Sequence, residues 1–269
     1  MSLEQSTVKL LGVRGSVPVS GTEFARYGGA TTCVLVHWEK QYLILDAGTG
    51  LLRLDDAVLQ EPELTLLLTH AHADHLLGLP LCPYLMRRSA RMDIYGATRG
   101  GMTVASQVER LLSPPLWPVG ADSLPATIRW HELPGTLRLG TVTVETMEGI
   151  HPDGVSLLRV TDGQRSVVMI TDCTITRDIL PELRRFAGGC DLLLCDGQYS
   201  EAEWEDRAEF GHSTWISAAR LAAECDAKRL RIIHHDPKHT DAVLDAAEQE
   251  VKAIFPNGAF AYEGEEVPL

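Results

Sequence analysis

The sequence predicts an α/β protein made of two halves that each run from strand to helix to strand. The chain has 269 residues, of which 45% are hydrophobic, and this is enough for one large domain with a full core. Short apolar runs of strand length alternate along it with longer segments of helical pattern. Two of these runs, Leu64–Leu68 and Val167–Ile170, lead into polar residues in the same way, which indicates two βαβ-type halves. We therefore expect residues 1–269 to form a single domain.

The charge of the chain limits its partners. The formal net charge is −13 and the isoelectric point is near 5.2. An acidic surface disfavours broad electrostatic binding, so no long nucleic acid is expected as a partner. A small phosphorylated substrate remains compatible with this charge, because bound metal ions can invert the local field.

The cysteines and the apolar segments predict a cytoplasmic protein. The six cysteines include no C-x-x-C pair, and a chain of this size needs no disulfide framework, so all six are expected to be reduced. Met1–Lys9 lacks a basic region followed by an apolar core, so no signal peptide is expected. No apolar run reaches the roughly 18 residues needed to span a bilayer, so no membrane is expected as a partner.

The first predicted strands lead into loops of small residues. These strands are Val8–Leu11, Cys33–His37 and Gln41–Leu45. The glycines of the loop Gly12–Pro18 suit close approach to an anion, although a plain connection has the same composition. Asp46 follows the third strand, where it can accept a hydrogen bond from a metal-bound histidine or form an ordinary turn. Leu51–Leu59 is a predicted helix.

Four metal-binding side chains follow the next strand, Leu64–Leu68. They are His70, His72, Asp74 and His75. The chain continues into Leu76–Pro80, which is predicted to start a helix, so the four side chains lie on a strand-to-helix turn. Zinc binds imidazole nitrogen and carboxylate oxygen at about 2.0–2.2 Å, and four ligands this close can serve two ions with two ligands each. Neither ion would be saturated, so further ligands must come from elsewhere in the chain.

The H-x-H-x-D-H pattern of residues 70–75 resembles the signature of the metallo-β-lactamase fold superfamily. The resemblance extends from Leu11 to Pro237 and includes the stretches Asp46–Gly50 and His234–Pro237. It implies a four-layer αβ/βα sandwich, with metal ions between the ends of two sheets. Di-iron redox members of the superfamily carry Glu where this chain has His72, so a redox protein is not expected.

The rest of the chain supplies further strands and helices in alternation. The predicted strands are Asp93–Gly96, Thr141–Met147, Val155–Thr161, Ser166–Ile170, Asp191–Cys195 and Leu230–Ile233. The predicted helices are Val104–Leu112, Ile179–Ala187, Ile216–Cys225 and Thr240–Ile254. The acidic run Glu201–Glu209 is predicted to form a solvated helix or a lid. Residues 80–130 hold few motifs, and the resemblance implies that this segment shapes the substrate pocket.

Polar residues at the ends of these strands complete two ligand sets. One ion is assigned to His70, His72 and His151, the other to Asp74, His75 and His235, and Asp172 bridges the two. His235 is preferred to His234 because Ile232–His235 aligns in register with Leu67–His70. Two divalent ions are therefore expected as cofactors. Zinc fits the histidine-rich set, and manganese or iron could replace it in the carboxylate-rich half.

Asp196 and His212 predict the type of chemistry. Asp196 ends an apolar strand, and His212-Ser213-Thr214 opens a helix. This pair resembles the phosphodiesterase branch of the superfamily, in which the histidine acts on the scissile phosphate and the acid orients it. Phosphodiester cleavage expels an alkoxide that needs a proton, which a positioned imidazolium supplies. The alternative is that His212 only caps the helix.

We expect a dinuclear metal-dependent hydrolase. Among such enzymes the sequence most favours a phosphodiesterase that acts on a small phosphodiester such as a cyclic nucleotide. The nucleophile would be a hydroxide that bridges the two ions, with Asp74, Asp196 and His212 as the catalytic residues. The alternatives are an acyl hydrolase (a lactonase or thioesterase), an RNA 3′-processing endonuclease and a non-catalytic sensing module. The chain lacks the long Gly/Pro/basic arm of the tRNA-processing enzymes, which weakens the second of these. A homodimer is compatible with the sequence.

Overall fold

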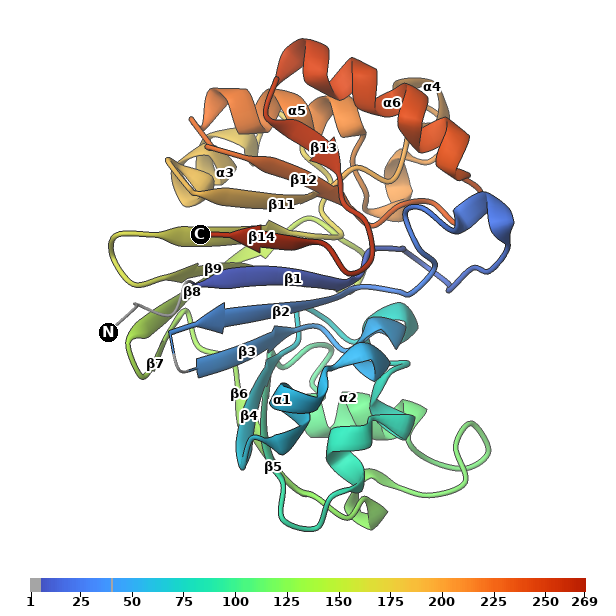
Figure 1. Cartoon of the computed structure of the whole chain (residues 1–269), viewed down its shortest axis with the longest axis vertical. Helices are drawn as coiled ribbons and strands as arrows, with labels where there is room; N and C mark the ends of the chain where they lie inside the picture. Colours follow the sequence, from blue (N-terminus) through green and yellow to red (C-terminus); the bar gives the residue numbers. More distant parts are fainter. Residues whose placement is uncertain (1–5, 40) are drawn as a thin grey trace.

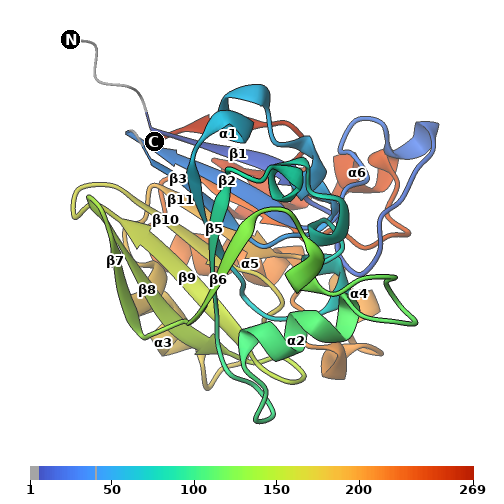
Figure 2. The same ribbon diagram turned by 90° about the horizontal axis from the view of Figure 1, so that it is seen from below.

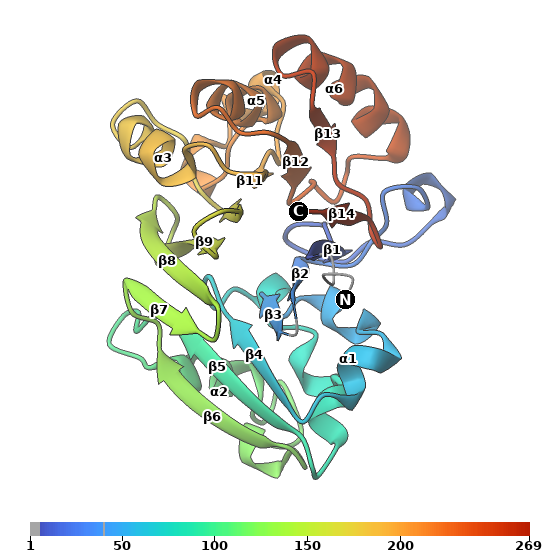
Figure 3. The ribbon, with the colours of Figure 1, turned by 60° about the vertical axis from the view of Figure 1, so that its left-hand side comes forward.

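Two β-sheets lie face to face, and helices cover the outer face of each (Figure 1). The computed structural model describes residues 6–39 and 41–269. Met1–Gln5, on which part of the expectation about a signal peptide rests, lie outside the described residues. Helices α3, α5 and α6 lie beyond the second sheet, and α1 and α2 lie beyond the first (Figures 1 and 3). The predicted four-layer α/β sandwich is confirmed.

The first sheet has seven strands in the order β14-β1-β2-β3-β4-β5-β6. Strands β3 to β6 are parallel to one another, so their carboxyl ends meet at one edge of the sheet. The bounds are β1 Thr7–Gly12, β2 Cys33–Trp38, β3 Gln41–Leu45, β4 Glu63–Leu67, β5 Arg91–Gly96, β6 Thr127–Glu132 and β14 Glu266–Pro268.

The second sheet also has seven strands, in the order β13-β12-β11-β10-β9-β8-β7. Strands β10 to β13 are parallel, and β7, β8, β9 and β10 form an antiparallel series. The bounds are β7 Thr136–Leu139, β8 Val142–Gly149, β9 Val155–Thr161, β10 Ser166–Ile170, β11 Leu192–Asp196, β12 Leu230–Ile233 and β13 Gly258–Phe260.

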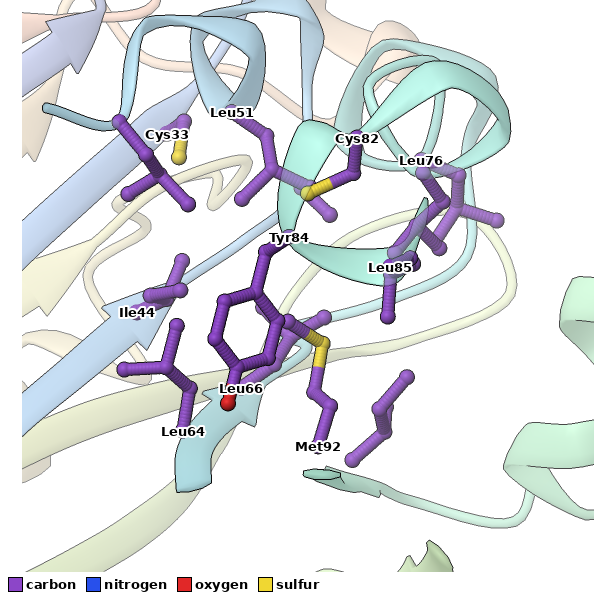
Figure 4. Packing of buried hydrophobic residues seen from close by; sticks show 14 of the residues in the cluster. Cys33, Ile44, Leu51, Leu64, Leu66, Leu76, Cys82, Tyr84, Leu85 and Met92 are labelled. Atoms are coloured by element: carbon purple, nitrogen blue, oxygen red, sulfur yellow. The ribbon is translucent and has the colours of Figure 1, made fainter. Parts of the chain in front are cut away.

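Three apolar clusters separate the four layers. One lies between the sheets and includes Trp38, Leu67 and Met169, none of which is exposed. A second lies between the first sheet and its covering turns, where Leu66 packs among the side chains drawn in Figure 4. The third fills the space under α3, α5 and α6. Burial of each such leucine or methionine contributes roughly 1.5–3 kcal/mol, so these layers fix the distance between the sheets.

The helices correspond to the predicted ones with shifts at their ends. Their bounds are α1 Asp56–Gln60, α2 Val104–Leu111, α3 Leu180–Ala187, α4 Glu201–Trp204, α5 Trp215–Glu224 and α6 Asp241–Ile254. Figure 2, seen from below, shows α1 and α2 on the near side of the first sheet. The predicted helix Leu51–Leu59 is two pieces, because Asp55 accepts a hydrogen bond from the amide of Val58 and starts α1 anew.

The prediction that a helix starts at Leu76–Pro80 is wrong. The chain there forms short 3₁₀ turns at Ala73–His75, Leu79–Leu81 and Pro83–Met86. Prolines lack the amide hydrogen that an α-helix needs in its interior, so Pro80 and Pro83 keep these turns short. His70 to His75 therefore lie on a compact turn that packs against the end of the first sheet.

The six cysteines are all free and buried. No helix among residues 6–39 and 41–269 has the length and apolar character that a membrane crossing requires.

We predict that Leu66→Ala lowers the free energy of unfolding by about 2–5 kcal/mol, because it leaves a cavity in the cluster of Figure 4. Denaturant unfolding in the presence of a chelator measures this without a contribution from bound metal. Leu81→Ala is the matched control, since Leu81 is 62% exposed and its loss should change stability by less than about 0.5 kcal/mol. Equal effects of the two substitutions would contradict the assignment of Leu66 to the core.

Candidate metal centre

The ends of six strands meet at one edge of the sandwich. Parallel strands of one sheet present their carboxyl ends together, and here the two sheets bring these ends face to face. The polar residues delivered by β3, β4, β8, β10, β11 and β12 are Asp46, His70, His72, Asp74, His75, His151, Asp172, Asp196 and His234.

His70, His72 and His151 form the first group, with one ring nitrogen of each within 4.8 Å of the others. Nδ1 of His72 lies 3.1 Å from Nε2 of His151. Two nitrogen ligands at about 2.0–2.1 Å from one tetrahedral zinc lie roughly 3.3 Å apart, so this spacing fits a shared ion. Nε2 of His70 is buried and has no hydrogen-bond partner among the described residues. The group therefore offers three nitrogen atoms to one cation.

Asp74, His75, Asp172 and His234 form the second group, again within 4.8 Å. Nε2 of His234 lies 3.1 Å from both Oδ2 of Asp74 and Oδ1 of Asp172. Nε2 of His75 is buried without a hydrogen-bond partner among the described residues, 3.2 Å from Oδ2 of Asp172. All four side chains are buried. The donor set of two imidazoles and two carboxylates suits a second divalent ion.

Asp172 lies between the two groups. Its Oδ1 is 3.8 Å from Nε2 of both His70 and His151, and its Oδ2 faces His75. The carboxylate can thus offer an oxygen to each group, which is the geometry expected of a bridging ligand. Its backbone has φ 50°, a left-handed conformation that Asp adopts more readily than most residues.

His234, and not His235, belongs to the second group, which corrects the sequence assignment. His234 follows the last residue of β12 with φ 63°, so the chain leaves the extended conformation there. Register counting assumes an extended backbone and therefore chose the wrong neighbour. His235 points away, where its Nε2–H donates to the carbonyl of Ala261 at 2.8 Å. Burial, with the nearby Arg14 guanidinium, lowers the pKa of His235 to about 3, so this ring is neutral.

Hydrogen bonds fix the orientation of the ligand rings. Nδ1–H of His75 donates to Oδ2 of Asp46 at 2.8 Å, and this contact distinguishes Asp46 from an ordinary turn residue. Nδ1–H of His151 donates to the carbonyl of Gly211 at 2.9 Å. Gly211 has φ 86°, and a Cβ there would lie 2.1 Å from that nitrogen, so glycine is required. Such partners set the tautomer of a metal-binding histidine.

The charges of the cluster are strongly coupled. Burial lowers the pKa of His70 well below its usual value. Burial also acts on His75, but the carboxylates of Asp172 and Asp74 outweigh it and raise the pKa of this ring. The same balance, led by Asp172, raises the pKa of His234 to about 10. Without metal, the two carboxylates therefore stabilise the protonated form of these imidazoles, and a cation must displace the protons to bind the ring nitrogens.

Asp196 and His212 lie beside both groups. Nδ1–H of His212 donates to Oδ2 of Asp196 at 2.8 Å. The ring of His212 stacks on His234 with centroids 4.8 Å apart and meets His151 edge-on at 5.2 Å. The cap of α5 is Thr214, whose hydroxyl accepts from the amide of Ser217, so helix capping does not explain His212.

Three further contacts of the centre were also not predicted from the sequence. Oε1 of Gln198 accepts from Nδ1–H of His234 at 2.9 Å. The amide of Ser16 donates to Oδ2 of Asp74 at 2.7 Å, so the glycine-rich loop does approach an anion, which is a carboxylate of the protein itself. The indole of Trp204 donates to the carbonyl of His212 at 3.0 Å. The glycines of residues 12–18 were the only sequence signal for any of these contacts.

Comparison with known proteins agrees with the fold. A family model described as a β-lactamase superfamily domain matches residues 41–235. The chain belongs to this superfamily. Among curated proteins it is similar to ribonuclease Z of Treponema pallidum strain Nichols, with 23% identity over 97% of this chain and 96% of that one.

Solved structures share the fold over the whole length. The metallo-β-lactamase fold protein YhfI of Bacillus subtilis superposes with a TM-score of 0.74 at 21% identity, covering 98% of this chain and 99% of that one. A diphosphatase of the PhnP family superposes with a TM-score of 0.70 at 17% identity, covering 98% and 97%. At these identities the superpositions establish the fold alone.

We predict that His234→Gln loses metal and that His235→Gln does not. Only His234 faces the two carboxylates, whereas Gln at 235 can still donate to the carbonyl of Ala261. Elemental analysis after dialysis, with circular dichroism as a check on folding, compares the two variants with the wild type. Normal metal content in His234→Gln together with loss in His235→Gln would restore the original assignment.

We further predict that metal uptake releases protons and strengthens as pH rises. Ligand nitrogens must be neutral, and the pKa of His234 in the metal-free centre is about 10, so binding near pH 7 displaces its proton. Calorimetry in buffers of different ionisation enthalpy measures the number of protons released, which should fall in His234→Gln. Binding heats that do not depend on the buffer would contradict the described charge balance.

Proposed function

We propose that the protein is a phosphodiesterase with a dinuclear metal centre. The chain is a metal-dependent hydrolase of the β-lactamase superfamily, and its buried groups of imidazoles and carboxylates suit divalent cations. The observation that carries the more specific proposal is the Asp196–His212 pair, which lies against both groups.

The two groups would hold one ion each. His70, His72 and His151 would bind the first, Asp74, His75 and His234 the second, and Asp172 both. When bound, the ions supply an activated water and neutralise the charge of the phosphate. Zinc suits the three-nitrogen group, and manganese or iron also suits the group with two carboxylates. Asp74 has a further role in this scheme, since its carboxylate also accepts a hydrogen bond from the amide of Ser16.

His212 would donate a proton to the departing oxygen. Asp196 accepts its Nδ1–H, which leaves Nε2 as the position for the transferable proton. Asp196 is fully buried, and it also accepts from the amides of Asp172 and Gln198, so its position is fixed from three sides. A lactone or thioester has less need of such an acid, which makes the acyl-hydrolase alternative weaker.

The comparisons support this class of reaction. The similar curated protein is by name a ribonuclease, an enzyme that cleaves phosphodiesters, and the PhnP-family structure is by title a diphosphatase. For the substrate itself we propose a small phosphodiester such as a cyclic nucleotide, since the net charge of −13 disfavours RNA. RNA 3′-end cleavage is the second candidate, because the ribonuclease Z similarity covers 97% of this chain.

We predict that His212→Ala keeps its metal content but cleaves phosphodiesters more slowly. The loss of rate should be greatest for leaving groups that must be protonated to depart. Cleavage of an ester with a sugar alkoxide leaving group should slow by about 10²–10⁴-fold, the usual contribution of a general acid. The loss should shrink for a nitrophenolate, which departs without protonation. Asp196→Asn should show the same pattern more weakly. Steady-state rates on paired substrates, with metal content of each variant, measure this.

His131→Ala is the matched control for the His212 experiment. His131 also pairs with a carboxylate, Asp93, at 2.6 Å, but it lies on β6 outside both ligand groups. The His131→Ala variant should cleave both esters at the wild-type rate. Equal losses on both leaving groups in His212→Ala would mean that His212 binds substrate and donates no proton. Unchanged phosphodiester rates, with lactone or thioester turnover, would favour an acyl hydrolase.

A further inference from the structure

A cavity of about 340 Å³ opens beside the candidate metal centre. It reaches the centre through His70 and His72, which form part of its wall, and neither His212 nor His234 lines it. The opposite wall comes from residues 99–116, around helix α2, a segment for which the sequence predicted only a role in the pocket. Ligand pockets span about 300–1,000 Å³, so this one can hold a single small organic group.

Much of the cavity wall is apolar. Its lining includes Leu76 of the turn after β4, together with Met102, Leu111 and Leu116. Leu116 is 68% exposed, although a large apolar side chain gains from burial, so a ligand in the cavity would cover surface that the protein leaves open. Gln107 also lines the cavity, and its amide nitrogen donates to the carbonyls of Ala97 and Met102. Its Oε1 is thereby fixed in place and accepts no hydrogen bond from the described residues.

Two arginines and one acidic residue line the cavity. Arg99 is already paired with Glu148, at 2.6 and 3.2 Å, so its charge is neutralised. Arg110 also lines the cavity and is exposed, and among the described residues it has no carboxylate within ion-pair distance. Asp153 is the one acidic residue of the lining, and it is 91% exposed. An unpaired guanidinium is thus available here in a chain of net charge −13.

We infer that this cavity binds an apolar group of the substrate, of nucleobase size and able to donate a hydrogen bond to Gln107, and that Leu116 determines this specificity. The inference rests on the proposed phosphodiesterase activity. Since the cavity meets the centre at His70 and His72, away from His212, the bound group belongs to the part of the ester that remains on phosphorus. Arg110 attracts the anionic substrate as a whole.

Two esters with the same leaving group test this. Thymidine 5′-(p-nitrophenyl phosphate) and methyl p-nitrophenyl phosphate both release nitrophenolate, so their demand on His212 is equal. The wild-type enzyme should have the higher kcat/KM on the nucleoside ester. Leu116→Asn should lower kcat/KM on the nucleoside ester roughly 10-fold, which is at the low end of what one altered pocket contact changes. Its kcat/KM on the methyl ester should stay at the wild-type value. Arg110→Gln should raise KM for both esters, most at low ionic strength.

Matched controls come from outside the cavity. Leu81 is 62% exposed and Arg88 is also exposed, so Leu81→Asn and Arg88→Gln make the same changes without touching the lining. Both should behave as wild type. Equal wild-type rates on the two esters, or a loss in Leu116→Asn that is equal on both or absent on both, would overturn the inference. Cleavage of neither ester by metal-loaded wild type would instead remove the proposed function, and this inference with it.

Discussion

The buried carboxylate of Asp172 is the constraint on which the rest of the centre depends. It is 2% exposed, and a buried charge is tolerated only when opposite charges or hydrogen bonds compensate it. Here the compensation comes from imidazoles on several strands, with His75 at 3.2 Å and His234 at 3.1 Å, and they hold its pKa well below the usual value although burial acts to raise it. Because these imidazoles come from different sheets, the charge can be satisfied only when the two sheets are packed together.

The two halves of the chain repeat one arrangement around this carboxylate. In the first half, buried Asp46 after β3 accepts from the backbone amide of Thr69 and from the ring of His75. In the second half, buried Asp196 at the end of β11 accepts from the backbone amide of Asp172 and from the ring of His212. The same local geometry thus orients a proposed metal ligand in one half, and in the other it orients the imidazole for which we propose proton donation.

The sequence predicted best those site residues that lie close together in the chain. His70, His72, Asp74 and His75 lie within six residues, so their chemistry was evident without any knowledge of the fold. Asp172, Asp196 and His212 followed from strand ends and small motifs, and the structure brings them to the same edge. The choice between His234 and His235 failed because it depended on a φ of 63°, which residue types do not specify.

Other features could not be predicted because their cause is not local. Gln198 is indistinguishable from a surface glutamine until β11 and β12 lie side by side and its Oε1 meets His234. Strands β6 and β7 were not predicted, because their half-exposed alternation at the sheet edges gives no continuous apolar run. The cavity beside α2 is lined by three separate segments of the chain, residues 70–76, 99–116 and 153–154, so composition alone gave only its approximate place.

Anomalous diffraction from crystals grown with zinc would reveal directly whether the centre holds two ions. We expect two peaks about 3.5–4 Å apart, the separation of dinuclear hydrolase centres, with an oxygen of Asp172 bound to each. We also expect His234 within bonding distance of one peak, His212 near both but bound to neither, and His235 still hydrogen-bonded to Ala261. A single peak, or a peak ligated by His212, would contradict the account.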